Sequence, residues 1–152
     1  MTAKKGYTLI EILIGIALFS ILFSIAMPNT NYFKDMMEKQ EIVEFKKDLL
    51  YARNMAIVEN RTYFVYFFKD QNSYSLKLSE TSPPIKSKTF GSGLKLNNNA
   101  VGSFIFKPSG TSGNSNTIYI NTRRNERYVV TIAPAANKIN IVLEEVGGKF
   151  EK

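Results

Sequence analysis

The stretch from Lys4 to Ile14 reads KKGYTLIEILI and opens a long apolar segment, residues 7–27, in which Glu11 is the only charge. A helix over such a segment is roughly 31 Å long at about 1.5 Å per residue, close to a hydrocarbon core of about 30 Å. Lys4 and Lys5 precede it, and the preference for cytoplasmic positive charge predicts an N-terminus on the inside. We therefore expect a single-pass transmembrane helix over residues 7–27, within which a buried carboxylate is costly.

An ordinary secretory signal peptide is the alternative reading of this segment. Ser24, Ile25 and Ala26 form a small-x-small pattern after which a signal peptidase would cut. Against this reading, the apolar region would contain a glutamate and run to about 20 residues, where about 7 to 15 are typical. A secreted or membrane-anchored β domain stays open as an alternative.

Composition excludes several classes of function. The chain has 152 residues, a net charge of +7, no cysteine and no histidine. Thiol nucleophiles, imidazole bases and nearly all zinc sites are therefore absent. The glycines at 110 and 113 lack the lysine and the spacing of a phosphate-binding loop. We expect no enzyme activity, no catalytic residues, no cofactor and no metal site.

A second helix is predicted over residues 28–61, after a break at Pro28. Its apolar residues recur at intervals of 3 and 4, which is typical of a helix packing on its own domain. This stripe consists of Ile42, Phe45, Leu49, Ala52 and Ala56. We expect Val43, Leu50 and Ile57 to widen the stripe.

From residue 62 the pattern changes to alternation, which predicts a β-rich head over residues 62–152. Residues 63–68 and 74–78 read as a hairpin, and no helix is expected between the later strands. Those strands are expected at 94–96, 103–106, 117–121, 128–133 and 138–143. The fold class is therefore α+β, a long N-terminal helix packed on a small antiparallel β-rich head.

One compact basic cluster, Arg123 to Arg127, falls at an expected hairpin tip. Clustered cations of this kind neutralise phosphates, so DNA is a candidate partner. The candidate contacts are Arg123, Arg124, Arg127 and Lys138, with Lys86, Lys88 and Lys107 extending the basic face. An exposed turn, which arginine and lysine commonly occupy, is the simpler explanation, because charge clustering alone is weak evidence for a ligand.

The N-terminal residues resemble the processing site of type IV pilins and pseudopilins. The similarity comprises a basic leader (residues 1–6), Gly6 before the cut, an aromatic first mature residue at Tyr7, and Glu11 as the fifth mature residue. Phenylalanine is usual after the glycine, so Tyr7 is a modest departure. Pro28 also resembles the helix break of these subunits.

The head resembles the H-type (GspH/FimT-like) minor pseudopilins at lower specificity. Residues 50–60 are similar to the helix end of that family, with its AR-x-x-A pattern at Ala52, Arg53 and Ala56. Residues 104–110 and 117–120 resemble its F-x-P-x-G and I-x-I strands, and residues 128–132 its penultimate strand.

This resemblance implies a structural subunit of a bacterial filament. A prepilin peptidase would cut between Gly6 and Tyr7 and methylate the new amine. The chain would then leave the lipid of the cytoplasmic membrane and join other pilins at an inner-membrane assembly platform. It would prime or cap an extracytoplasmic filament of type II secretion or a type IV pilus, with a DNA-binding competence pilin as the alternative. We expect Glu11 to pair with the Tyr7 ammonium of a neighbouring subunit.

Overall fold

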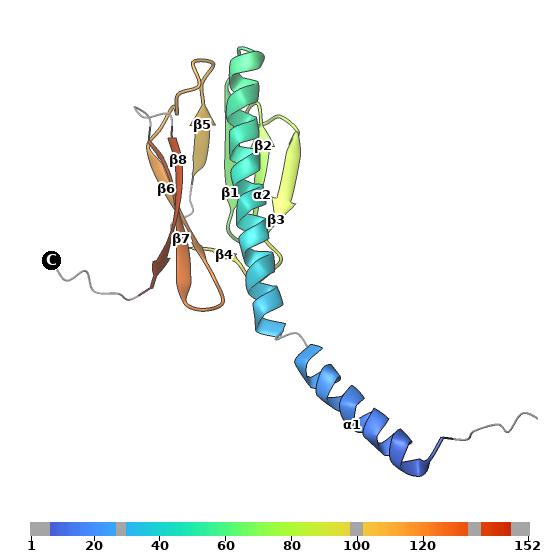
Figure 1. The fold of residues 1–152 in the computed structure, drawn as a ribbon. Coiled ribbons are helices and arrows are strands. Elements are labelled where there is room, and N and C mark those ends of the chain that lie inside the picture. Colours follow the sequence, from blue (N-terminus) through green and yellow to red (C-terminus); the bar gives the residue numbers. More distant parts are fainter. Residues whose placement is uncertain (1–6, 27–29, 98–101, 134–137, 147–152) are drawn as a thin grey trace, which may run out of the picture. The chain divides into compact units, whose positions relative to one another are not determined.

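The computed structural model describes residues 7–26, 30–97, 102–133 and 138–146. The chain divides into two compact units, Met1–Asp35 and Met36–Lys152, and each is considered by itself. Within these described ranges the helices are α1 (Leu9–Ala26) and α2 (Thr30–Val58), and eight strands follow them (Figure 1). The Pro28 break lies outside the described residues, between the end of α1 and the start of α2.

Helix α1 has 18 residues, fewer than the 21 of the predicted segment. The helix begins at Leu9. Thr8, directly before it, is the cap of its first turn. In the described part of the chain, no helix is both long enough and apolar enough to cross a membrane. This finding differs from the transmembrane helix predicted over residues 7–27.

Helix α2 buries the stripe that its periodicity predicts. Phe45, Leu49, Ala52 and Ala56 are fully buried, and Ile42 is nearly so. The prediction for the neighbouring row was wrong. Val43, Leu50 and Ile57 do not widen the stripe but are exposed at 52%, 38% and 46%. At 100° per residue, each lies one step further round the helix than a buried residue, which turns Val43 and Leu50 towards solvent and places Ile57 beside Gly110 of the loop after β5.

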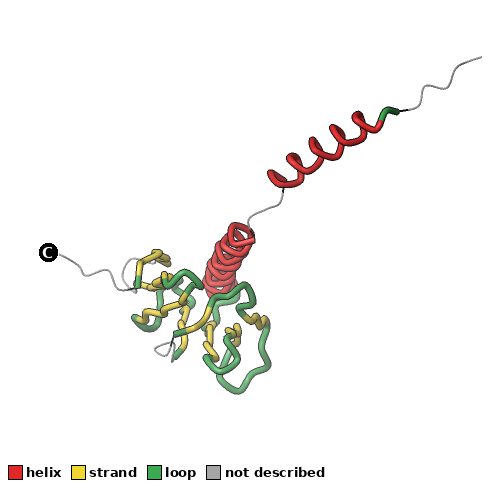
Figure 2. Tube along the Cα trace, turned by 90° about the horizontal axis from the view of Figure 1, so that it is seen from below, coloured by secondary structure: helices red, strands yellow, loops and turns green. Residues whose placement is uncertain are grey.

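The head contains two four-stranded antiparallel sheets, in the orders β3-β2-β1-β5 and β4-β6-β7-β8. The strands of the first sheet are β1 (Tyr63–Phe68), β2 (Ser73–Lys77), β3 (Lys86–Thr89) and β5 (Ser103–Phe106). Those of the second are β4 (Lys95–Leu96), β6 (Asn116–Asn121), β7 (Glu126–Ala133) and β8 (Lys138–Glu145). Both sheets lie on the same side of α2 (Figure 2).

The predicted α+β class is confirmed, and most strands fall where alternation placed them. Strand β3 was missed because its sequence, KSKT, is polar throughout and carries no apolar alternation. It forms an edge of the first sheet, where a strand buries little and tolerates lysine. The strands of the antiparallel head are divided between two sheets, a division that alternation along the chain does not predict.

The core is one apolar cluster shared by α2 and both sheets. Phe45 projects from α2 and meets Phe67, Tyr74 and Phe90 edge to face, with ring centroids 6.0, 4.9 and 5.7 Å away. Such aromatic contacts contribute about 0.5–1.5 kcal/mol each beyond the area that they bury. The helix and the head therefore form one packed unit from Met36 onward.

Asn72 connects the two sheets through its backbone and its amide. It adopts a left-handed φ of 48° in the turn between β1 and β2. Its side-chain amide nitrogen donates to the carbonyls of Phe90 (2.9 Å) and Leu94 (2.8 Å). Its side-chain oxygen accepts from the Leu96 amide at 2.9 Å. The hairpin of one sheet is thus fastened to the segment that enters the other.

Replacing Asn72 with alanine is expected to lower the free energy of unfolding by about 4–5 kcal/mol. Three hydrogen bonds contribute about 1 kcal/mol each, and alanine is disfavoured at positive φ by about 1–2 kcal/mol. Asn125→Ala is the matched control, because Asn125 also has a positive φ (62°) but its side chain makes one longer bond, at 3.4 Å to the Val146 carbonyl, and its backbone bond to the Val146 amide does not depend on the side chain. Urea unfolding followed by circular dichroism compares the two, and equal losses would contradict the fastening role.

Candidate processing and assembly site

The first described residues form a capping box at the start of α1. Thr8 is the N-cap, and its hydroxyl accepts the Glu11 amide at 3.4 Å. In return, Glu11 Oε2 accepts the Thr8 backbone amide at 2.8 Å and the Thr8 hydroxyl at 3.0 Å. This reciprocal arrangement satisfies donors that a helix terminus otherwise leaves unpaired.

The role of Thr8 was missed from the sequence, although the signal was present. Thr8 and Glu11 stand three apart directly before an apolar run, which is the sequence pattern of a capping box. Glu11 therefore has a partner within its own chain. Both bonds to its carboxylate use Oε2, so the charge keeps a second oxygen for another donor.

Helix α1 presents apolar side chains all round its surface. Within the described unit, Ile10, Leu18 and Phe19 are 64%, 57% and 69% exposed, although they point in different directions. Ser20 and Ser24 do not interrupt this surface, because their hydroxyls donate to the carbonyls of residues 16 and 20, at 2.8 and 2.9 Å. Such a helix requires cover from lipid or from other helices.

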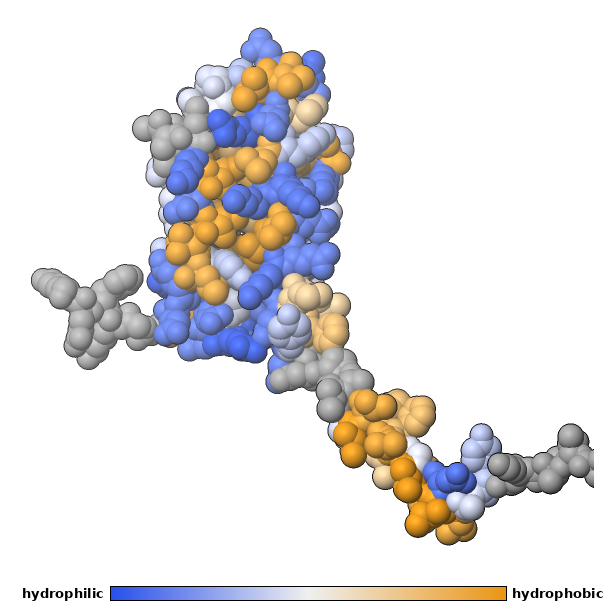
Figure 3. Space-filling model, viewed as in Figure 1, coloured by the Kyte–Doolittle hydropathy of each residue, from blue (hydrophilic) through white to orange (hydrophobic). Residues whose placement is uncertain are grey.

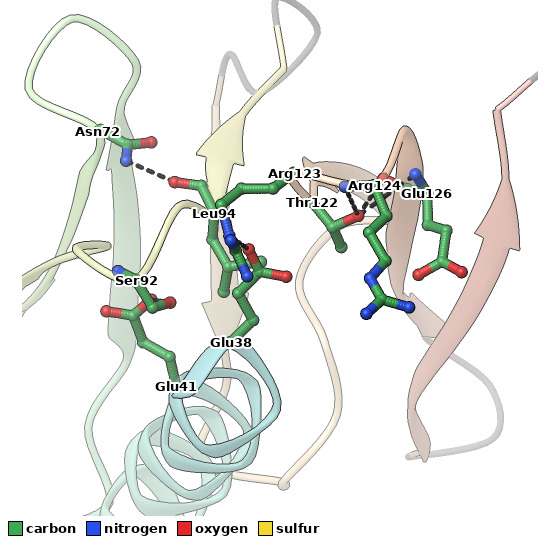
Figure 4. Close-up of polar contacts among 9 residues, drawn as sticks. All are labelled: Glu38, Glu41, Asn72, Ser92, Leu94, Thr122, Arg123, Arg124 and Glu126. Atoms are coloured by element: carbon green, nitrogen blue, oxygen red, sulfur yellow. Dashed lines mark hydrogen bonds and ion pairs between the residues drawn. The ribbon is translucent and has the colours of Figure 1, made fainter. Parts of the chain in front are cut away.

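In the head, carboxylates along one flank of α2 hold two loops. Glu38 is almost fully buried and accepts from Arg123 Nε at 2.6 Å (Figure 4). Glu41 accepts the backbone amides of Gly91 (2.7 Å) and Ser92 (3.2 Å), and also the Ser92 hydroxyl. The turn between β6 and β7 and the loop before β4 are thereby fixed to the helix.

The next carboxylates hold the edge strand β3. Glu44 forms an ion pair with Lys88, and Asp48 pairs with Lys86 at 2.5 Å. Asp48 also accepts the Tyr74 hydroxyl at 2.7 Å. Burial, together with this bond to a carboxylate, raises the pKa of Tyr74 above its ordinary value. Four of the five acidic side chains of α2 are therefore bound to groups of the head.

Most of the arginines and lysines that were predicted to contact DNA form ion pairs within the head. Arg123 is held by Glu38, and Arg127 pairs with Glu144 at 3.1 Å while its guanidinium stacks over the Tyr119 ring. Lys138 is exposed at the start of β8. Lys86 and Lys88 are also paired, as described above. DNA contact by this surface stays a prediction.

The two motifs of the head meet in space. Arg53 Nε donates to the Gly110 carbonyl at 3.0 Å, which joins the end of α2 to the loop after β5. Gly110 has a φ of 76°, and a Cβ there would lie 2.8 Å from Ile57. The arginine of the AR-x-x-A pattern and the glycine of the F-x-P-x-G pattern therefore form one contact.

Of the predicted processing and assembly residues, the structure describes Tyr7 and Glu11, whereas Gly6 lies outside the described residues. Tyr7 is 85% exposed beside the capped turn. Among the described residues, no group of three or more metal-ligating side chains is present. Thr8 and Glu11 cap helix α1, and Tyr7 is exposed and accessible for contact with other molecules.

An apolar helix with a glutamate in its first turn, followed by a helix packed on antiparallel sheets, defines a pilin-like subunit. Residues 1–27 match the prokaryotic N-terminal methylation motif. Residues 41–136 match the family of the type II transport protein GspH. The chain belongs to this GspH family, which confirms the resemblance to minor pseudopilins.

Solved structures share the fold. The type IV minor pilin FimU of Pseudomonas aeruginosa is 20% identical with a TM-score of 0.59, over 73% of this chain and 92% of that chain. The minor pseudopilin EpsH from the type 2 secretion system of Vibrio cholerae is 17% identical with a TM-score of 0.54, over 69% and 95%. No curated protein matches the sequence.

Proposed function

We propose that this protein is a minor subunit of a type II secretion pseudopilus or a type IV pilus, in which it initiates or caps the filament. The observation that carries the proposal is the exposed apolar surface of α1 behind a capped Glu11. A surface of this kind is stable only when other apolar groups surround it, as neighbouring helices do in a filament. The head contributes the contacts outside that bundle.

Before assembly, lipid of the bacterial cytoplasmic membrane covers α1, with Lys4 and Lys5 on the cytoplasmic side. A prepilin peptidase hydrolyses the bond between Gly6 and Tyr7, which leaves a carboxylate on Gly6 and a free amine on Tyr7, and transfers a methyl group to that amine from a sulfonium methyl donor, which leaves as the thioether. This step creates a cation at Tyr7, four residues before Glu11. The assembly platform then passes the subunit to other pilins, and the head ends outside the cytoplasm.

Intact-mass measurement of the chain from its native membrane tests the processing step. We expect loss of residues 1–6 and the gain of one methyl group, whereas Gly6→Val is expected to leave the leader in place. The bulky β-branched side chain would then flank the scissile bond. Cleavage after Ala26 would instead identify an ordinary secretory signal and overturn the proposal.

A further inference from the structure

The outward face of α2 carries an apolar row at intervals of seven residues. Met36, Val43 and Leu50 form this row, which we call the α2 seam, and they are 50%, 52% and 38% exposed; Ile57 continues the spacing but lies against Gly110 of the head. In an ideal α-helix, side chains seven residues apart differ in direction by only about 20°, so the side chains of this row lie nearly one above another. Apolar surface broken by hydrophilic surface is visible where α2 crosses the head (Figure 3).

Exposed basic side chains flank the α2 seam. Lys39 and Lys46 stand three residues beyond Met36 and Val43, and Lys47 stands four beyond Val43, so each is a surface neighbour of the row. All three lysines are exposed. The four carboxylates that hold the head, by contrast, lie on the flanks nearer to the sheets.

The net charge of α2 does not reveal how its acidic and basic side chains are distributed around the helix. Helix α2 contains five basic and five acidic side chains in its sequence and is neutral as a whole. Four of the acids are bound to the head, and Lys39, Lys46 and Lys47 face solvent. A partner approaching the seam therefore meets an apolar ridge with Lys39 and Lys46 on one side and, on the other, Lys47 beside Glu44, whose charge is paired with Lys88.

We propose that the α2 seam binds a helix from a different subunit, one whose own apolar row is flanked by glutamate or aspartate. A second copy of this chain would bring lysine rows against lysine rows, and like charges in such pairs are destabilising. A lipid surface fits less well because a membrane-bound helix needs a broad apolar face. Tyr51 and Ile85 widen the apolar surface beside Val43, but Gln40, Asn54 and the lysines interrupt it. This inference rests on the proposed function, because it names the class of neighbour within the filament.

Two synthetic helical peptides test the charge preference. Both carry leucine at seven-residue intervals, one with glutamate and the other with lysine at the flanking positions. Fluorescence anisotropy measures their binding to the full chain in a neutral detergent, which covers α1. We expect the glutamate peptide to bind roughly tenfold more tightly at low salt, and the difference to shrink in 1 M salt.

Variants separate the seam from general charge. The triple variant K39E/K46E/K47E is expected to reverse the preference between the peptides. The matched triple variant K69E/K95E/K107E changes the same number of exposed lysines away from α2 and is expected to retain it. Leu50→Gln is expected to weaken both peptides, and circular dichroism checks that each variant is folded.

Other outcomes would overturn the inference. Equal binding of the two peptides, or equal effects of the two triple variants, would remove the charge preference. Self-association of the chain that Leu50→Gln abolishes would identify a second copy as the occupant, and binding to anionic vesicles lost in K39E/K46E/K47E would identify a membrane. Correct processing at Tyr7 in the same preparation would show that the seam alone had failed.

Discussion

Arg123→Ala is expected to lower the free energy of unfolding of the head by about 3–5 kcal/mol. The reason is the charge that the substitution leaves behind. The side chain of Glu38 is only 6% exposed and receives Arg123 Nε at 2.6 Å. Without the guanidinium, the carboxylate is buried unpaired, which costs far more than a surface ion pair contributes. Urea unfolding followed by circular dichroism measures the change.

Two variants identify the cause of that loss. Arg124→Ala removes an exposed neighbouring arginine from the same turn and is expected to cost no more than about 1 kcal/mol. Glu38→Leu combined with Arg123→Leu removes both charges and is expected to recover most of the stability. A cost below about 1 kcal/mol for Arg123→Ala would mean that Glu38 does not depend on this partner.

Local patterns in the sequence predict the elements of this fold well. The 3-and-4 spacing from Ile42 to Ala56 places the buried stripe of α2 correctly, and alternation places β1, with β2 to within a residue. The motif around Gly6 and Glu11 indicates a pilin-like protein, and the short motifs of the head indicate the GspH family. These features depend on residues close together in the chain, which is why one sequence is enough.

Choices that depend on distant residues were not predictable. The rows Ile42–Leu49–Ala56 and Val43–Leu50–Ile57 are both apolar and lie one residue apart, so periodicity alone does not say which faces the sheets. The bond between Glu38 and Arg123 joins residues 85 positions apart. Contacts of this kind follow from how α2 lies on the sheets, and no local pattern contains that information.

Glu11→Ala is expected to leave the chain in the membrane fraction but to reduce its incorporation into filaments or tip complexes by about tenfold or more. A carboxylate in the apolar layer costs about 2.5–3.5 kcal/mol, and a neighbour's Tyr7 ammonium would offset much of that cost. Out-of-register subunits leave both charges unmatched, so the pair selects registry. Shearing filaments from cells and comparing the sheared and membrane fractions measures the effect.

The capping box adds a second explanation that Glu11→Ala alone does not exclude, because alanine removes both the cap and the charge. Glu11→Gln separates them. A glutamine side-chain oxygen still accepts the Thr8 amide, since the capping box takes Glu or Gln, but it cannot form an ion pair. Thr8→Ala makes the complementary change, losing about 1 kcal/mol of cap while keeping the charge. If pairing with the ammonium drives assembly, Glu11→Gln fails as Glu11→Ala does and Thr8→Ala assembles. If Glu11→Gln assembles like the wild type, Glu11 serves its own helix and not its neighbour.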